Sequence, residues 1–277
     1  MDFSKMALRD TNKRKYWSSL YKAIWKTIKQ KKAVLDREFQ YCLEPYGYPP
    51  IDVNEVVEQR FGRNGAFIPI HKPITELNET LTFWVVPAQY AHDAASHDQI
   101  IDDKIALHLQ VSRIRDKLGH ALVDMIHYAA HHTGLTYSTK LTEVKNWDGN
   151  NLSTSQGAID IVLISFQSQT VYGIEAKNLA QIIERKYVTR KLMKHITNCQ
   201  ILGMKPVFIV SRIFPTAAKH LEQQGAVVIE TEAQFYQKKY WAIARNLKQN
   251  LGYHFVRRVG HPKQIAVLSQ KLSQVLV

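Results

Sequence analysis

Two short apolar segments on either side of a turn constrain the fold of this chain more than any other feature. They cover residues 157–165 and 171–178, and the turn covers residues 166–170. Apolar segments of this length, separated by a short turn, predict two antiparallel strands. Because successive side chains of a strand point to opposite faces, Glu175 and Lys177 are expected on the same face of the second strand.

The first strand carries one acidic residue, Asp160, which antiparallel pairing would bring close to Glu175. Two carboxylates can hold a hard divalent cation, and the backbone carbonyl of Ala176 can add a neutral oxygen ligand. Such an ion neutralises a phosphate and makes a bound water more acidic. The ammonium of Lys177 can orient that water and stabilise the charge of the transition state. Together these residues predict a metal-dependent phosphodiesterase.

A strand with an aspartate, followed by a strand with Glu-x-Lys, resembles the motif of the PD-(D/E)xK nuclease superfamily, which includes many restriction endonucleases. The resemblance covers about residues 105–235. It implies an α/β fold with a restriction-endonuclease-like core, in which helices flank a central mixed β-sheet. It also implies that Asp160 and Glu175 are metal ligands, that Lys177 is the catalytic lysine, and that the cofactor is Mg²⁺, with Mn²⁺ as a substitute. Ile159 occupies the position of the proline in the superfamily's name.

Many members of that superfamily also carry a glutamate on a helix before the first strand. The helix expected here covers residues 113–128 and contains no glutamate. Asp124 and His120 are the nearest candidates, and their spacing of four residues puts them on one face of the helix. Asp124 is therefore included among the expected catalytic residues.

The segments after the motif predict alternating helices and strands. Helices are expected within residues 179–198 and 215–224, and strands within residues 205–211 and 226–230. Pro215 favours the start of the second helix. The last strands would then join a mixed sheet through right-handed crossovers, which gives an α/β sandwich with the site at the strand ends.

Composition indicates a polyanionic partner. The chain has 37 lysine and arginine residues against 24 acidic residues, a formal net charge of +13 and a pI of about 9.6. Double-stranded DNA is the expected partner. Cys42 and Cys199 lack the spacing of a zinc site or a disulfide framework. We expect no membrane span, no secretory leader and no nucleotide cofactor, and hence a cytoplasmic, DNA-associated protein.

Residues 1–104 and 236–277 are expected to be additions to the nuclease core of residues 105–235, the second of them a helical extension. They leave room for a region that reads sequence or forms a homodimer. Residues 13–32 predict a basic amphipathic helix. This helix is interpreted as a scaffold element, a DNA-contacting element or a membrane-surface helix. Three lysines off its apolar stripe are the candidate DNA contacts: Lys22, Lys26 and Lys29.

Three basic residues after the motif recur every four residues, at Lys186, Arg190 and Lys194. They predict either phosphate contacts beside the scissile bond or a solvated helix face. Asn178 and Gln181 lie even closer to the motif in sequence and are further candidate contacts to DNA.

The favoured function is a magnesium-dependent endonuclease of a restriction or defence system. A junction-resolving, repair or transposition-associated nuclease of the same fold is the first alternative. A DNA-binding protein that kept the fold without catalysis is the second. The pattern of Asp160, Glu175 and Lys177 favours an enzyme, whereas the missing upstream glutamate favours the non-catalytic alternative.

Overall fold

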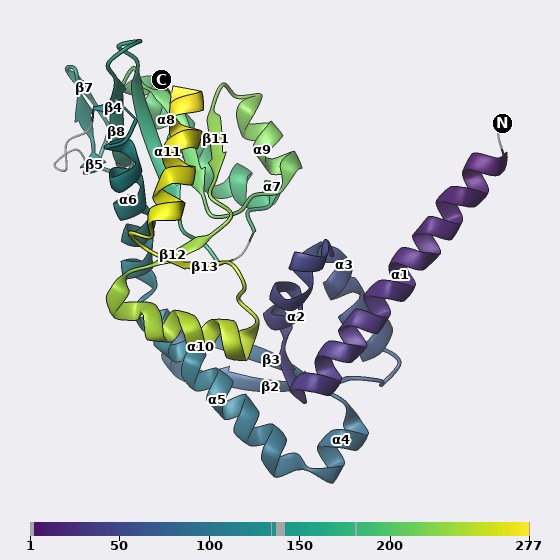
Figure 1. Ribbon diagram of the computed structural model, residues 1–277. Coiled ribbons are helices and arrows are strands. Elements are labelled where there is room, and N and C mark those ends of the chain that lie inside the picture. The colour runs from purple at the N-terminus through teal and green to yellow at the C-terminus, as the bar shows by residue number, and fades with distance from the viewer. Residues whose placement is uncertain (1–2, 134, 137–141, 181, 277) are drawn as a thin grey trace. The chain divides into compact units, whose positions relative to one another are not determined.

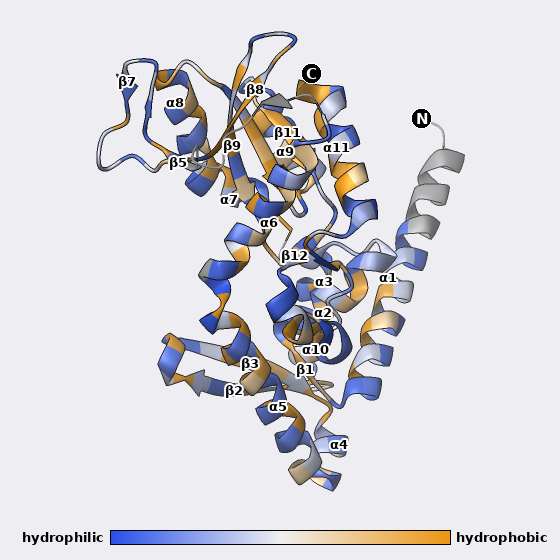
Figure 2. Ribbon diagram, turned by 60° about the vertical axis from the view of Figure 1, so that its left-hand side comes forward, coloured by the Kyte–Doolittle hydropathy of each residue, from blue (hydrophilic) through white to orange (hydrophobic). Residues whose placement is uncertain are grey.

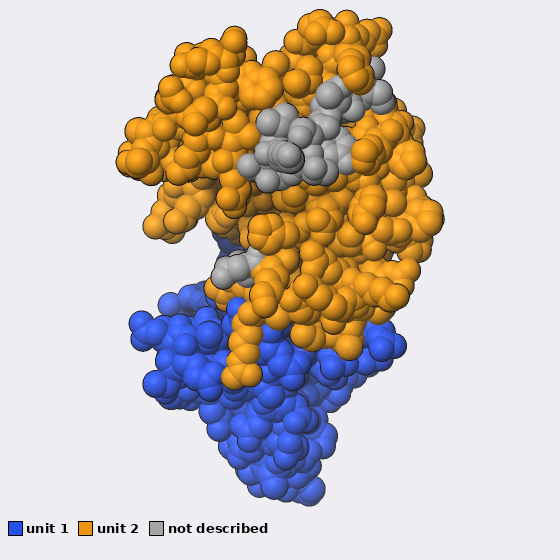
Figure 3. Space-filling view, turned by 90° about the vertical axis from the view of Figure 1, so that its left-hand side faces the viewer, with its two compact units in different colours: residues 1–112, 245–254 blue, residues 113–244, 255–277 orange. Residues whose placement is uncertain are grey.

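The computed structural model describes residues 3–133, 135–136, 142–180 and 182–276, so Gln181 lies outside the described residues. The chain divides into two compact units, coloured separately in Figure 3. Unit 1 consists of Met1–Ser112 and Arg245–His254, and unit 2 consists of Arg113–Ala244 and Phe255–Val277.

This division differs from the expected three parts, because residues 236–277 do not form a part of their own. Residues 245–254 belong to unit 1 and the remainder to unit 2. Strand β12 (Gln234–Tyr236) pairs in parallel with β13 (Val256–Arg258), which ties the C-terminal segment to unit 2. Helix α11 (Pro262–Leu276) then buries three leucines in the core of that unit: Leu268, Leu272 and Leu276.

Unit 2 is built on a mixed sheet, as expected from the sequence, with the strand order β11-β10-β9-β8-β4 (Figure 1). The β8–β9 pair is antiparallel, β9, β10 and β11 are parallel to one another, and β5 also pairs with β8. The bounds are β4 Leu135–Thr136, β5 Thr142–Val144, β8 Ile159–Ser165, β9 Val171–Lys177, β10 Lys205–Val210 and β11 Val227–Glu230.

Helices cover both faces of this sheet. Helix α6 (Arg115–Ala130) and α11 pack against the face that carries Ile174 and Ala176 of β9. Helices α8 (Met193–Ile201) and α9 (Pro215–Glu222) contribute to the cluster on the opposite face, around Phe208 of β10. In Figure 2 the central strands of this sheet are mostly orange, whereas α11 has an orange and a blue side. Since side chains alternate along β9, Glu175 and Lys177 share the face of α8.

The helix expected directly after β9 begins later, at Arg185. Backbone hydrogen bonds from Ile183 N to Arg212 O and from Phe214 N to Ile183 O hold Ile183 in a parallel bridge. This bridge lies between β9 and the helix, which begins only after it. The helical segment then consists of α7 (Arg185–Tyr187), the π-helical turn η4 (Val188–Leu192) and α8.

Unit 1 combines a long helix with a three-stranded sheet. Helix α1 (Phe3–Lys31) buries Leu20, Ile24 and Ile28 completely, so the amphipathic helix expected from the sequence is confirmed. The sheet has the order β1-β3-β2, with β1 Ala33–Leu35, β2 Ile68–Ile74 and β3 Glu79–Val85. The other elements are α2 Asp36–Leu43, η1 Glu44–Tyr46, α3 Pro50–Asn54, η2 Glu55–Gly62, η3 Thr75–Leu77, α4 Pro87–His92 and α5 Ala94–Arg113.

Three short elements complete unit 2, and helix α10 belongs to both units. The three short elements are β6 Asn146–Trp147, β7 Asn150–Asn151 and η5 Lys238–Tyr240, and α10 covers Trp241–Leu251. None of the helices in the described ranges combines the length and the apolar character needed to cross a bilayer.

Candidate active site

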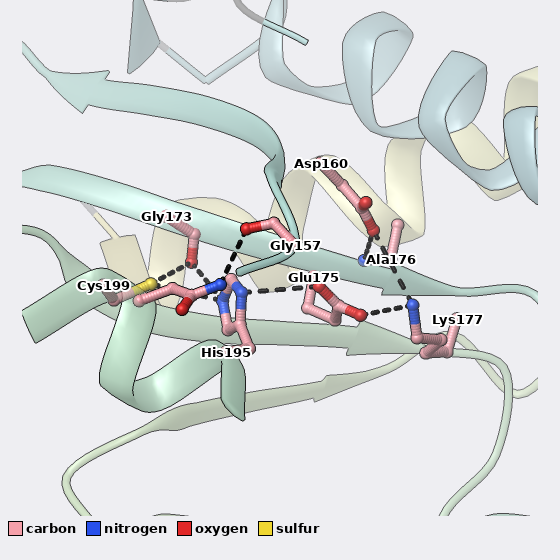
Figure 4. Close-up of polar contacts among 9 residues, drawn as sticks. Gly157, Asp160, Gly173, Glu175, Ala176, Lys177, His195 and Cys199 are labelled. Carbon is pink, nitrogen blue, oxygen red and sulfur yellow. Dashed lines mark hydrogen bonds and ion pairs between the residues drawn. The ribbon is translucent and has the colours of Figure 1, made fainter. Parts of the chain in front are cut away.

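The site lies where β8 and β9 separate, on the face of the sheet that α8 covers (Figure 4). The backbone ladder between the strands ends at the pair of Ile161 and Ile174. One residue further along, Asp160 and Glu175 are therefore opposite each other. Asp160 Oδ2 accepts a hydrogen bond of 2.8 Å from the N–H of Ala176, so a side chain replaces the next backbone acceptor.

Lys177 places an ammonium between the two carboxylates. Its Nζ is 4.0 Å from Asp160 Oδ2 and forms an ion pair with Glu175 Oε1. All three side chains are partly exposed, so a solute can reach them. The structure thus brings together the three residues that the sequence singled out, at the carboxyl end of β9.

The environment keeps Lys177 positively charged. Burial alone would lower the pKa of Lys177, but the carboxylates of Glu175 and Asp160 outweigh burial and raise it. Burial, followed by the negative charge of Glu175, raises the pKa of Asp160. At neutral pH Lys177 is consequently a fixed cation rather than a general base, as transition-state stabilisation requires.

Ala176 lies within β9, between the two charged residues, and donates its N–H to Asp160. Its carbonyl remains a predicted metal ligand. Across the described ranges, no three histidine, cysteine, aspartate or glutamate side chains are grouped closely enough to hold a metal ion as they stand. The predicted donor set therefore contains only two carboxylates in the described residues, those of Asp160 and Glu175, with the ammonium of Lys177 between them. These hard oxygens fit Mg²⁺ or Mn²⁺ once the ammonium moves aside.

The structure adds His195, which the sequence reasoning missed. This residue is on α8, its side chain is 4% exposed, and its Nδ1 is 3.4 Å from Glu175 Oε2. Its Nε2 is 3.0 Å from the carbonyl oxygen of Gly173, and its ring packs edge-on against Phe208. Burial lowers the pKa of His195 to about 4, so the imidazole is neutral at neutral pH.

Gly173 allows α8 to approach β9 this closely. A Cβ atom at this position would be 2.6 Å from Cys199 Sγ, and Cys199 is one helical turn after His195. The signal in the sequence was a glycine inside a strand, which often marks a close approach of another segment. Its distant partner could not be identified from the sequence.

Gly173→Ala is therefore expected to destabilise unit 2 and displace α8. The added methyl group must push Cys199 away, and overpacking of this kind lowers the free energy of unfolding by about 1–3 kcal/mol. Urea denaturation would measure the loss. In a Cys199→Ala background the loss should be smaller because the sulfur is gone. Equal losses in both backgrounds would contradict the proposed contact.

Tyr187 is a second residue that the sequence reasoning missed. It belongs to α7 and is half-buried beside the site. Burial raises the pKa of Tyr187, the positive charge of Lys177 opposes the rise, and the negative charge of Glu175 adds to it. The phenol is thus close enough to sense both charges.

Asp124 does not join the site, which corrects the expected catalytic role. Its Oδ2 accepts a hydrogen bond of 2.9 Å from Gln237 Nε2. Helix α6 covers the face of the sheet that carries Ile174, whereas Glu175 projects from the other face. The helix that was expected to supply an upstream acid is therefore on the wrong side of the sheet to do so.

Asn178 is also placed differently from the expectation that it contacts DNA. The residue is buried, and its Nδ2 donates to the carbonyls of Leu118 and Phe235 at 2.6 and 2.8 Å. Its Oδ1 accepts the N–H of Phe235 at 2.8 Å. These bonds join the end of β9 to α6 and β12, so the amide has a structural role and is not available to a phosphate.

The other candidate DNA contacts are exposed. Lys186, Arg190 and Lys194 lie on α7, η4 and α8, and Lys194 Nζ donates to the carbonyl of Ser155 at 2.7 Å. Their contact with DNA remains a prediction. The same holds for the exposed lysines of α1, which are Lys22, Lys26 and Lys29.

Two carboxylates and an ammonium at one strand end can bind a divalent ion, hold a phosphate and stabilise added negative charge. All three side chains are partly exposed. No protein-family model, curated protein or solved structure matches this chain.

Proposed function

We propose that the protein is a metal-dependent DNA endonuclease with a restriction-endonuclease-like core. The observation that carries the proposal is the meeting of Asp160 and Glu175, from adjacent strands, with the ammonium of Lys177. Structural ion pairs are common, but the position of this group at the end of a mixed sheet, open to solvent, favours a catalytic role.

In the proposed mechanism Asp160 and Glu175 would hold Mg²⁺, and the carbonyl of Ala176 would add a neutral ligand. A bound Mg²⁺ would neutralise phosphate charge and acidify water. Lys177 must move from its position between the carboxylates, which its long flexible side chain permits. Once it has moved away from the carboxylates, its ammonium would bind the phosphate oxygens that gain negative charge as the P–O bond breaks.

The charge distribution supports a nucleic acid substrate. Unit 2 contains 20 lysine and arginine residues against 10 acidic residues, whereas unit 1 contains 17 against 14. Most of the excess positive charge is therefore in the unit that carries the site. Such an excess attracts the DNA backbone before specific contacts form.

We propose that the nuclease acts in a restriction or defence system. This role is supported by unit 1, which has apolar clusters of its own and is as large as a small domain. A second unit of this size can read sequence or form a homodimer, functions that a bare nuclease core lacks.

Incubation of the pure protein with supercoiled and linear plasmid DNA tests the proposal. We expect nicked and linear products with Mg²⁺ or Mn²⁺ and none with a chelator. Substrate with a single-stranded region and RNA would be compared in the same assay. Absence of cleavage of every substrate with each ion would overturn the proposal.

The basic helix α1 makes a separate prediction about DNA affinity. Replacing Lys22, Lys26 and Lys29 by glutamine should weaken binding to all sequences about equally. The slope of log affinity against log salt should become shallower by up to ~2–3 units because fewer counterions are released. The fold should survive because the three positions are exposed.

A second triple variant serves as the matched control, with Lys186, Arg190 and Lys194 replaced by glutamine. It removes the same charge from unit 2. If the α1 variant keeps the wild-type salt slope while the second variant loses slope, α1 is a scaffold element and the DNA contact belongs to unit 2.

A further inference from the structure

Unit 1 contains a cavity of about 360 Å³ that the proposed catalytic site does not use. It lies between α1, α2 with the turn that follows α2, and His254 (Figure 1). All of its lining residues belong to unit 1. Its volume is at the lower end of the range for pockets that hold small organic molecules, so it can accept one such group.

Three rings line the cavity, those of Tyr46, Tyr48 and His254. Tyr46 is 75% exposed, whereas Tyr48 is partly buried. The ring of Tyr48 lies 5.6 Å from the ring of Tyr16, and the hydroxyl of Tyr16 donates to Asp52 Oδ2 at 2.5 Å. One ring is therefore held by packing, and another is open to solvent, where a flat ligand can stack on it.

The turn that carries the two tyrosines has little conformational freedom. Pro45 and Pro49 each fix one backbone torsion on either side of it. Between them Gly47 has a φ of 81°, a left-handed conformation that glycine adopts readily. Its N–H donates to the carbonyl of Glu44 at 2.8 Å. A stiff turn loses little entropy when a ligand binds, so the rings are preorganised.

The charged side chains of the cavity are basic. Lys26 and Lys31 line it, and none of its described lining residues is acidic. Lys31 Nζ is 2.8 Å from Glu38 Oε1, so its charge is already compensated. Lys26 is exposed and forms no ion pair with another described residue. Its ammonium is consequently the group left for an anion.

We propose that this cavity binds one unpaired nucleotide of a single DNA strand, with the base against the rings of Tyr46 and Tyr48 and a phosphate at Lys26. Aromatic rings beside basic side chains bind single strands with little regard to sequence. In a duplex each base is stacked and paired, so it must leave the helix to enter such a pocket. The proposal rests on the proposed nuclease function for the choice of DNA as the polymer.

Binding of two fluorescent single strands in the presence of a chelator tests the proposal without any cleavage. One strand is an oligodeoxynucleotide of mixed sequence, and the other has the same length and charge but carries no bases. We expect the wild type to bind the strand with bases more tightly. Tyr46→Ala should reduce this preference roughly 5-fold or more, because a stacked base is lost. Its affinity for the strand without bases, and for a fully paired duplex, should stay near the wild-type value.

Two further variants separate the ring from the charge. Tyr46→Trp keeps an aromatic surface and should retain the preference for bases. Lys26→Gln should weaken binding to both single strands about equally, because both carry the same phosphates. The slope of log affinity against log salt should become shallower by ~0.7, the value for one phosphate contact with a single strand.

Tyr128→Ala is the matched control, since Tyr128 is 50% exposed on α6 in unit 2 and does not line the cavity. It should keep the wild-type preference for bases. Equal preferences in Tyr46→Ala and the wild type, equal losses in Tyr46→Ala and Tyr128→Ala, or a wild type that binds both strands alike would each overturn the base pocket. The nuclease function fails separately, by the absence of plasmid cleavage with a divalent ion.

Discussion

Asp160→Ala and Glu175→Ala are each expected to abolish cleavage. Each substitution removes one of the two carboxylates that meet at the end of β9. Loss of a metal ligand removes about 4 kcal/mol or more of transition-state stabilisation, which is at least a ~1000-fold fall in rate. The measurement is the single-turnover rate on plasmid DNA with saturating Mg²⁺ or Mn²⁺.

DNA binding should survive these substitutions. Without a divalent ion, affinity should be unchanged or higher, because a negative charge that repels phosphate has gone. Asp160→Asn is the conservative control, since its amide oxygen can still accept the N–H of Ala176. It should keep the stability of the wild type while losing cleavage. Near-normal cleavage by any of the three variants would refute the assignment.

Lys177→Ala is expected to lower the cleavage rate by roughly 100-fold or more, equivalent to about 3 kcal/mol of barrier. The raised pKa of Lys177 keeps its ammonium charged, so the variant removes a full positive charge from beside the proposed position of the scissile phosphate. DNA affinity should change little, because the proposed interaction strengthens only in the transition state. Single-turnover rates at saturating DNA, together with binding curves, measure both effects.

Lys177→Arg tests whether cleavage requires a compact ammonium at this position or whether any positive charge is sufficient. Its planar guanidinium is larger and cannot occupy the position between Asp160 and Glu175 in the same way, so it should not restore the rate. If the loss in Lys177→Ala disappears at saturating DNA, Lys177 binds the ground-state phosphate, and its proposed catalytic role is wrong.

The sequence predicted the two-strand motif and its three charged residues because the relevant interactions are local. Period-two alternation determines which side chains share a face, and a five-residue turn leaves few possible registers. The mixed sheet could also be predicted, since β10 and β11 follow helical segments and must be parallel to β9. The buried stripe of α1 followed in the same way from helical periodicity.

Tertiary packing decided what joins the site. The helix begins only after the bridge at Ile183, and the π-helical turn η4 inserts a residue that rotates α8 by about 100° relative to a regular helix. Helical periodicity counted from Lys177 could therefore not predict where His195 points. Its contact with Glu175 also depends on the close approach of α8 at Gly173.

Packing likewise determined the positions of two residues whose roles were predicted wrongly from the sequence. Asp124 is excluded because α6 covers the face of the sheet opposite to Glu175. Asn178 is buried by β12, a strand that comes more than fifty residues later in the chain. The sequence by itself determined that the charged residues of two neighbouring strands share one face of the sheet, because the pleat of a strand fixes which side chains point to the same face. Only the folded chain decided which distant residues surround them, because burial on a given face depends on long-range packing.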